Sequence, residues 1–154
     1  MELVFDVETD GLYLDAKNIW CLVAVDENDK VYSFKTDEIN KGIDLLKSAD
    51  KIIGHNIIGF DIPVIKKLTG VDLYKHTEVL DTLTLSRLFH PTREGGHSLE
   101  KWGYKLNYLK SEQPEFDSYS DNMLEYCLRD VTLNKKVLNY LRKESVGFSK
   151  ESIE

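Results

Sequence analysis

Residues 3–12 are Leu3-Val4-Phe5-Asp6-Val7-Glu8-Thr9-Asp10-Gly11-Leu12. The apolar start predicts a buried strand, and side chains two residues apart on a strand point to the same face. Asp6 and Glu8 are therefore expected side by side, where two carboxylates in a dry setting repel each other strongly. A divalent cation with oxygen ligands offsets that repulsion most simply. Taken alone, the pair would be better explained as solvated acids at the end of a strand, because short motifs often occur by chance.

Length and composition predict one domain. The chain has 154 residues, of which 42% are hydrophobic and 31% charged, and this suits one domain with a real core. We expect a single domain over residues 1–154, with a core of about 3–142 and a charged, frayed tail at 143–154. The apolar runs have the length of strands, so neither a transmembrane helix nor a membrane partner is expected.

The net charge of −7 argues against a protein that coats duplex nucleic acid through bulk electrostatics. It is compatible with a nuclease that holds one strand end through metal ions. Cys21 and Cys127 lie in apolar patterns, which predict buried free thiols. Together with the lack of a secretory leader, they predict a cytoplasmic location, that of the host cell if a phage encodes the chain.

Apolar periodicity predicts the order of strands and helices. Strands are expected at about 3–5, 19–25, 31–34, 51–54 and 79–80, and helices at about 38–48, 61–68, 82–89, 98–102 and 121–142. Residues 55–60, 91–96 and 110–120 are expected to form loops. Short connections favour antiparallel pairing of the first three strands, and the helix before the fourth favours parallel pairing with the first. This order predicts an α/β fold with a mixed five-stranded sheet and helices on both faces.

Two further regions bring acids toward the first pair. Asp61 follows the loop at 55–60 and stands at the start of a helix, where the helix dipole alone would also favour an aspartate. Tyr126 and Asp130 lie four residues apart on a helix and share a face that turns partly toward the core. An aspartate in that position needs a partner, either in a functional site or in a salt bridge to an arginine or lysine, for example Arg129 or Lys135.

In order along the chain, these residues form a three-part pattern. It consists of Asp6-x-Glu8, of Asn56 followed by Phe60-Asp61, and of Tyr126-x-x-x-Asp130. The pattern resembles the three motifs of the ribonuclease-H-like 3′–5′ exonucleases with four acids and a tyrosine, the DEDDy subgroup.

Further segments resemble the proofreading domain of phage family A DNA polymerases, and the similarity covers about residues 3–141. They are His55-Asn56, Asp81-Thr82-Leu83, Leu85-Ser86-Arg87-Leu88 and His97-Ser98-Leu99-Glu100-Lys101-Trp102-Gly103-Tyr104. No polymerase follows in the sequence. A free-standing exonuclease, a subunit of a separately encoded polymerase and an excised domain therefore all remain open.

The resemblance implies a reaction that uses two Mg²⁺ or Mn²⁺ ions. It implies that Asp6 bridges the two ions, that Glu8 and Asp130 complete one site, and that Asp61 acts through water or a second shell of contacts. Tyr126 would orient the attacking water through its hydroxyl, because an unperturbed pKa of about 10 does not suit a free phenolate base. The expected substrate is the 3′ end of single-stranded DNA, and the expected products are nucleoside 5′-monophosphates.

The resemblance also suggests residues that contact the nucleic acid. Leu12 would press against the terminal base, with ordinary turn packing as the equal alternative, and the others expected near the strand are Thr9, Gly11, Asn56 and Phe60. Candidate phosphate contacts are Arg93, Lys101 and Lys105, although a solvated charged face explains each of them better. His55 and His97 are expected to form hydrogen bonds near the site.

Two rival functions remain from the sequence. An RNA exonuclease of the same fold is one, because no residue decides how a 2′-hydroxyl would be read. A non-catalytic nucleic-acid or polymerase-binding module is the other, and loss of one metal-binding acid would be its signature. All four acids are present. The sequence specifies neither the oligomeric state nor mismatch preference.

Overall fold

The computed structural model describes residues 1–153, with side chains described for residues 1–146. Five strands form one sheet in the order β3-β2-β1-β4-β5. The strands are β1 (Glu2–Thr9), β2 (Ile19–Asp26), β3 (Val31–Lys35), β4 (Lys51–Gly54) and β5 (Glu78–Asp81). The helices are α1 (Ile39–Ser48), α2 (Ile62–Thr69), α3 (Thr82–Phe89), α4 (Leu99–Lys105) and α5 (Asp121–Ile153). Three short helical turns are η1 (Thr36–Glu38), η2 (Ile57–Asp61) and η3 (Leu73–Lys75).

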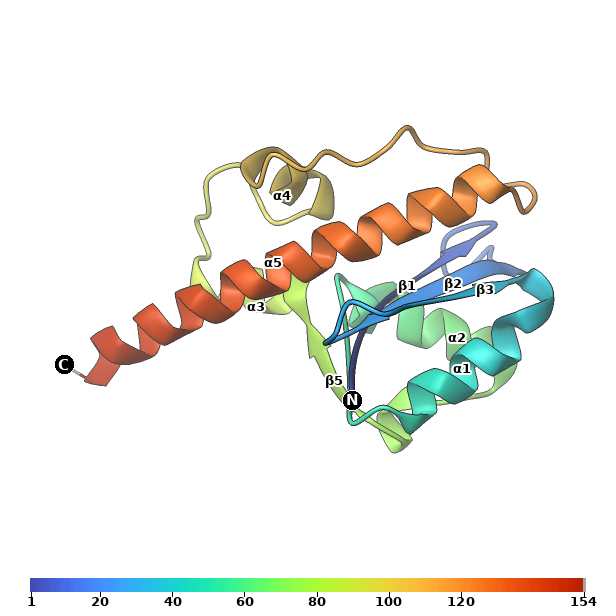
Figure 1. Ribbon diagram of the computed structural model, residues 1–154, viewed down its shortest axis with the longest axis horizontal. Coiled ribbons are helices and arrows are strands. Elements are labelled where there is room, and N and C mark those ends of the chain that lie inside the picture. The colour runs from blue at the N-terminus through green and yellow to red at the C-terminus, as the bar shows by residue number, and fades with distance from the viewer. Residues whose placement is uncertain (154) are drawn as a thin grey trace.

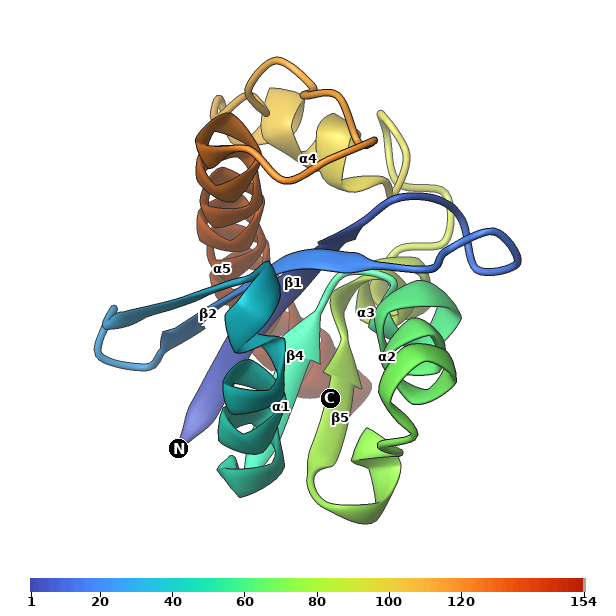
Figure 2. The same cartoon turned by 90° about the vertical axis from the view of Figure 1, so that its right-hand side faces the viewer.

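The strand pairing agrees with the predicted α/β fold. Strand β1 runs antiparallel to β2 and parallel to β4, while β2–β3 is antiparallel and β4–β5 is parallel. Figures 1 and 2 show α5 on one side of the sheet and α1 and α2 on the other. The mixed five-stranded sheet with helices on both faces is therefore confirmed. The parallel pairs follow because a helix or helical turn carries the chain back across the sheet before β4 and β5.

Alternation along β1 decides which side carries the acids. Leu3, Phe5 and Val7 pack into the apolar cluster under α1 and α2. Val4 packs on the other side, with Cys127 and Val131 of α5. Because side chains on a strand alternate between faces, the even-numbered Asp6 and Glu8 share the side of Val4 and lie toward α5.

Three predicted boundaries differ from the structure. Strand β1 continues to Thr9, so Asp6 and Glu8 lie within the strand and not beyond its end. Residues 57–61, expected in a loop, form the π-helical turn η2. Helix α5 runs to Ile153, whereas the sequence predicted an end at Arg142 and a frayed tail at 143–154, of which residue 154 lies outside the described residues.

An ion pair between Arg93 and Glu144 supports helix α5 just beyond its predicted end at Arg142. No proline interrupts residues 143–153. Arg93, from the segment between α3 and α4, donates Nη2 to Glu144 Oε1 at 2.7 Å and to the Ser86 carbonyl oxygen at 3.0 Å. The guanidinium lies 4.7 Å from the centre of the Trp102 ring. Segment 91–96 is thus anchored to α3, α4 and α5 by a buried arginine.

Candidate active site

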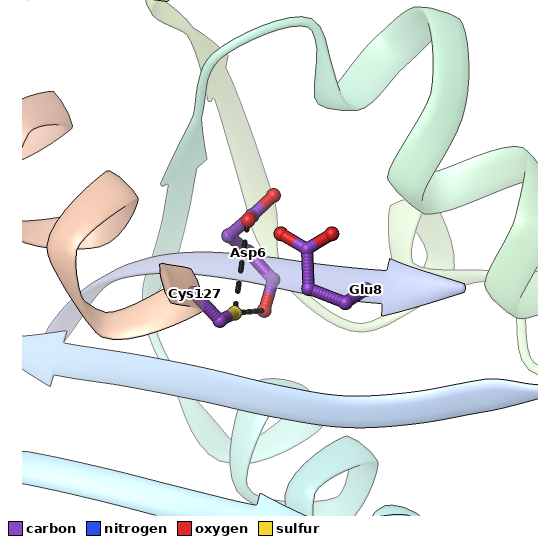
Figure 3. Close-up of side chains that lie close together, drawn as sticks. All are labelled: Asp6, Glu8 and Cys127. Atoms are coloured by element: carbon purple, nitrogen blue, oxygen red, sulfur yellow. Dashed lines mark hydrogen bonds between the residues drawn. The ribbon is translucent and has the colours of Figure 1, made fainter. Parts of the chain in front are cut away.

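Strand β1 brings the first two carboxylates into the centre of the sheet. Asp6 is paired with Val23 and Glu8 with Cys21 of the neighbouring strand β2. Figure 3 shows the two carboxylates rising from the same side of β1, with the Cys127 side chain of α5 beside Asp6. The thiol of Cys127 donates to the Asp6 carbonyl oxygen at 3.4 Å and lies 3.7 Å from Asp6 Oδ2.

The turn η2 brings Asp61 to this pair. Asp61 is 3% exposed, and its Oδ2 accepts a hydrogen bond from the Val7 backbone N–H at 3.2 Å. Asp61 stands at the N-cap position of helix α2, as the sequence predicted, but its side chain makes no capping hydrogen bond to that helix. The residue lies where β1 and η2 meet, next to the first acidic pair.

A second aspartate fixes the shape of that turn. The carboxylate of Asp81, at the end of β5, accepts backbone N–H groups of Asn56 at 2.9 Å and Ile58 at 3.0 Å, and also caps α3 through Leu83 N–H. Asn56 adopts a left-handed conformation with φ of 63°, which asparagine tolerates better than most residues. Asp81 therefore holds the backbone that carries Asn56 and Asp61.

Helix α5 supplies the remaining acid and the tyrosine. Tyr126 and Asp130 are both buried and, one turn apart, face β1. The Nζ of Lys110 lies 3.4 Å from Asp130 Oδ2, whereas Asp130 Oδ1 is buried and has no hydrogen-bond partner among the described residues. The predicted alternative of a salt bridge from Asp130 to an arginine or lysine is therefore present, but its partner is Lys110, and the suggested partners Arg129 and Lys135 are wrong. Arg129 donates to the Leu109 carbonyl oxygen and Lys135 contacts Asp26 and Asp29.

These residues converge on one cavity of about 280 Å³. All four predicted acids line it, together with Tyr126, His55, Asn56 and Phe60. Its walls also include Lys110, Gln113 and Phe116 from the segment before α5. Acids from β1, η2 and α5, far apart in the sequence, thus face one small space.

Burial raises the pKa of every acid in the cluster. It raises the pKa of Asp6, and burial together with Asp6 raises the pKa of Asp61 well above its usual value. Burial and the negative charge of Asp6 raise the pKa of Glu8 to about 11. The same two causes raise the pKa of Asp130 to about 7, against the opposing effect of Lys110. The cluster therefore retains protons that a bound cation would replace.

The donor set suits a hard divalent cation. Among the described residues, ligand atoms of Asp6, Glu8 and Cys127 lie within 4.8 Å of one another. Burial and nearby Cys21 raise the pKa of the Cys127 thiol well above its usual value, so it remains a hydrogen-bond donor and the carboxylates remain as ligands. Oxygen ligands and the unpartnered Asp130 Oδ1 fit Mg²⁺ or Mn²⁺.

The structure does not bring Thr9, Gly11 and Leu12 into the lining of this cavity. Thr9 Oγ1 donates to the Gly11 carbonyl oxygen at 2.7 Å, which tightens the turn after β1. Leu12 is 76% exposed, so the alternative of ordinary turn packing is wrong. Lys67 of α2 donates to the carbonyl oxygens of Tyr13 and Leu14 and holds the loop that presents Leu12.

The predicted phosphate contacts and the predicted histidine hydrogen bonds differ in how the structure places them. Arg93 is buried in its ion pair with Glu144, so its prediction as a phosphate contact is wrong. Lys101 and Lys105 line a different, open cavity on α4. His55 hydrogen-bonds Thr82 Oγ1 at 2.8 Å and the His97 carbonyl oxygen at 2.7 Å, and His97 Nδ1 bonds Ser86 Oγ at 2.7 Å. The predicted histidine hydrogen bonds beside the site are confirmed.

Three residues at the site escaped the sequence analysis as functional candidates. Cys127 looked like an ordinary core residue, and Asp81 was noticed only as part of a resembling segment. Lys110 lies at the start of a polar loop, where no periodicity indicates direction. One signal was available for Lys110. Asp130 was expected to turn toward the core, and no basic residue lies three or four positions from it on the helix, so a distant basic residue was needed as its partner.

Comparisons with known proteins agree with this geometry. The RNase_H superfamily matches residues 3–112. The chain is 26% identical to the DNA-directed DNA polymerase of Enterobacteria phage T3 and 25% identical to that of Escherichia phage T7, in each case over 97% of this chain and 28% of the relative. The chain thus spans little more than a quarter of these curated relatives.

Solved structures show the same fold. NrnC of Brucella melitensis superposes with a TM-score of 0.72 at 19% identity, covering 97% of this chain and 77% of that one. Exonuclease X in complex with 5′ overhanging duplex DNA superposes with a TM-score of 0.58 at 18% identity, covering 91% and 92%. Within residues 1–153, no helix combines the length and apolar character needed to span a membrane. The match of the family model to residues 3–112, which the sheet order agrees with, shows that this chain belongs to the ribonuclease H superfamily.

Proposed function

We propose that the chain is a metal-dependent 3′–5′ exonuclease that hydrolyses terminal phosphodiesters of single-stranded DNA to nucleoside 5′-monophosphates. One observation carries this proposal. A single cavity is lined by four carboxylates and a tyrosine from three separate elements, and one lysine offsets only part of the negative charge. Asp61, Asp130 and Tyr126 are buried, and Asp6 and Glu8 are partly buried. A purely structural cluster of this kind would be costly, because buried like charges destabilise a fold unless something binds them.

Two divalent ions bound here would stabilise the attacking and leaving oxygens of an in-line displacement at phosphorus. Asp6, Glu8 and Asp130 are the residues that would hold them, and Asp61 would act from beside Asp6. The Tyr126 hydroxyl would orient the attacking water. Burial raises the pKa of Tyr126 against the opposing effect of Lys110, so the hydroxyl stays protonated and is suited to positioning, not to proton abstraction.

A path of linked cavities favours a strand longer than the terminal nucleotide. Lys110, Gln113 and Tyr126 also line a second cavity of about 330 Å³, which reaches Tyr104 on α4. Tyr104 in turn lines a third cavity of about 450 Å³ with Lys101 and Lys105. We propose that the strand leaves the acids along this path. The Tyr104 ring would stack on a base, and the ammonium groups of Lys101 and Lys105 would bind phosphates.

The larger cavity on the other side of residues 110–120 suits this role less well. It measures about 920 Å³, and its charged lining is Glu112, Glu115, Glu125 and Arg129. Three carboxylates and one guanidinium would repel a phosphate backbone. The two cavities of the path over α4 are lined by three lysines, Lys101, Lys105 and Lys110, against the two carboxylates of Glu94 and Glu100, so the charge of this path favours a phosphate backbone.

The choice of DNA over RNA rests on the phage polymerase relatives. The NrnC structure bound to pGG has a TM-score of 0.71, and exonuclease X is bound to duplex DNA, so related folds accept both short and long ligands. A proofreading role is part of the proposal because the curated relatives are DNA polymerases. A non-catalytic module is disfavoured because no acid of the set is missing.

The proposal is tested with matched single strands of DNA and RNA, labelled at either end and incubated with Mg²⁺. Stepwise shortening of 5′-labelled DNA, with mononucleotide 5′-monophosphates released from 3′-labelled DNA, is the expected result. Faster degradation of RNA would transfer the proposal to an exoribonuclease. Internal cuts, or shortening from the 5′ end, would contradict it.

A further inference from the structure

Lys110 is the one lysine or arginine among the residues that line the carboxylate cavity, considered over the part of the chain whose side chains are described. Its Nζ lies 3.4 Å from Asp130 Oδ2 and 5.2 Å from the centre of the Tyr126 ring. The Lys110 side chain is only partly buried, whereas the Asp130 side chain is 6% exposed. A partly exposed ammonium thus reaches into the acidic cavity and contacts a buried carboxylate.

The neighbouring basic residues are committed to other contacts. Arg129, adjacent to Asp130 in sequence, donates Nε to the Leu109 carbonyl oxygen at 2.5 Å and stacks over the Tyr108 ring at 4.1 Å. Lys135 donates to the carbonyl oxygen of Asp26, at the far end of β2. Lys110 is therefore the group that offsets the charge of Asp130, and it reaches only one of the two carboxylate oxygens.

The backbone around Lys110 is attached at two places. Arg129 holds Leu109 on one side, and on the other the Trp20 indole Nε1 donates to the Phe116 carbonyl oxygen at 2.7 Å. Between these anchors the segment arches past the first turns of α5 (Figure 1). Gln113 and Phe116 of the same segment also line the carboxylate cavity. Movement of the Lys110 ammonium can therefore occur without releasing the anchors.

We propose that Lys110 is the built-in counterion of the carboxylate cluster, and that its ammonium leaves Asp130 when a divalent cation binds there. The inference rests on the proposed function, because it assumes that the cluster binds metal. An ammonium and a divalent cation repel each other strongly at contact distance in a poorly solvated site. Lys110 therefore stabilises the metal-free protein and weakens metal binding, and metal loading includes an exchange of cations at Asp130.

Substitution of Lys110 by methionine tests the exchange, because it removes the charge and keeps an unbranched apolar side chain beside Tyr126. Mn²⁺ binding is followed by the electron spin resonance signal of free Mn²⁺, without substrate. Lys110→Met is expected to bind Mn²⁺ on the order of tenfold more tightly than wild type. Its melting temperature without metal is expected to fall, and the rise in melting temperature caused by Mn²⁺ is expected to grow.

Lys66→Met is the matched control. Lys66 Nζ lies 3.8 Å from Asp72 Oδ2 and does not line the carboxylate cavity, so the control makes the same change of net charge and also removes a lysine–aspartate pair. It should bind Mn²⁺ like the wild type. Lys110→Arg keeps the charge and should also remain near wild type, which separates charge from packing.

Each remaining outcome decides the question. Equal Mn²⁺ affinity in Lys110→Met and Lys66→Met would overturn the exchange, as would weaker binding in Lys110→Met, which would make Lys110 a support for Asp130. Tighter binding in Lys110→Arg would show that packing and not charge is responsible. If the wild-type protein bound no Mn²⁺, both this inference and the proposed function would fail, whereas the other results leave the proposed function intact.

Discussion

A substitution at Tyr126 tests the positioning of the attacking water separately from metal binding. Its hydroxyl is one helical turn from Asp130, and Tyr126→Phe keeps the ring packing against Phe116, whose ring centre lies 6.3 Å away. We expect the rate of single-turnover cleavage to fall by up to roughly 10²–10⁴ while DNA binding changes little. Asp6→Ala is expected to be slower still, because metal binding itself would be lost. Full single-turnover activity in Tyr126→Phe would make the tyrosine a packing residue.

Protonation of the acids gives a pH-dependent expectation for metal binding. The pKa of Asp130 is raised to about 7 and that of Glu8 to about 11, so both groups hold protons near pH 7 that a cation must displace. Apparent Mn²⁺ affinity should therefore increase as pH rises from 6 to 8. Titration calorimetry in two buffers of different ionisation enthalpy should detect the released protons. Identical heats in both buffers would contradict this account.

The same pKa values determine the sign of the effect on stability without metal. A carboxyl whose pKa is higher in the folded protein than in the unfolded chain binds more protons when folded. Stability of the metal-free protein should therefore decrease as pH rises from about 4 through about 7, the interval between the ordinary and the raised pKa of Asp130. Thermal melts with EDTA across this interval provide the measurement, and added Mn²⁺ should reverse the trend.

At the scale of elements, Arg93 connects α3, α4 and the second half of α5. The side chain is 1% exposed, and removal of its guanidinium leaves the Glu144 carboxylate and the Ser86 carbonyl oxygen without their partner. Arg93→Ala is expected to lower the free energy of unfolding by about 3 kcal/mol, at the lower end for a broken buried pair because Glu144 is partly exposed. Urea denaturation is the measurement. Arg87→Ala, at an exposed site of α3, is the control and should change stability by less than about 0.5 kcal/mol.

Local patterns predicted the elements but not the contacts between distant ones. Apolar runs predicted β1 and β2, short connections and a crossover helix predicted the pairing, and strand alternation predicted that Asp6 and Glu8 share a face. The turn η2 was missed because its backbone donors bond to Asp81, which lies 25 residues after Asn56. The length of α5 and the burial of Arg93 were missed for the same reason, since each depends on the other across 51 residues.

Some site residues could likewise be predicted from local patterns, whereas others depend on contacts between distant segments. Asp6 and Glu8 follow from strand alternation alone, and Tyr126 with Asp130 follows from helical spacing. Their convergence with Asp61 was predicted only through a family resemblance, because no local pattern determines how η2 meets β1. Lys110 belongs to an irregular segment, so its direction depends on the anchors at Leu109 and Phe116.

At the scale of the whole molecule, the net charge predicts which form of DNA, single-stranded or duplex, is cleaved faster. The net charge of −7 argues against binding of duplex DNA through bulk electrostatics, so binding should depend on the strand end and the lysines of α4. A blunt duplex end must first fray, which costs a few kcal/mol of unpairing and unstacking. Initial rates should therefore be higher on single strands than on blunt duplexes of the same sequence. Equal rates would indicate a strand-separating element elsewhere in the molecule.

If the four carboxylates form a metal-dependent exonuclease site, cleavage requires both a divalent cation and Asp6. The most direct measurement incubates wild type and Asp6→Ala, both checked for folding by circular dichroism, with 5′-labelled single-stranded DNA in Mn²⁺ or in EDTA. We expect a ladder shortened from the 3′ end for wild type in Mn²⁺, and intact DNA in the other three reactions. A wild-type ladder in EDTA, or a ladder from Asp6→Ala at the wild-type rate, would contradict this expectation.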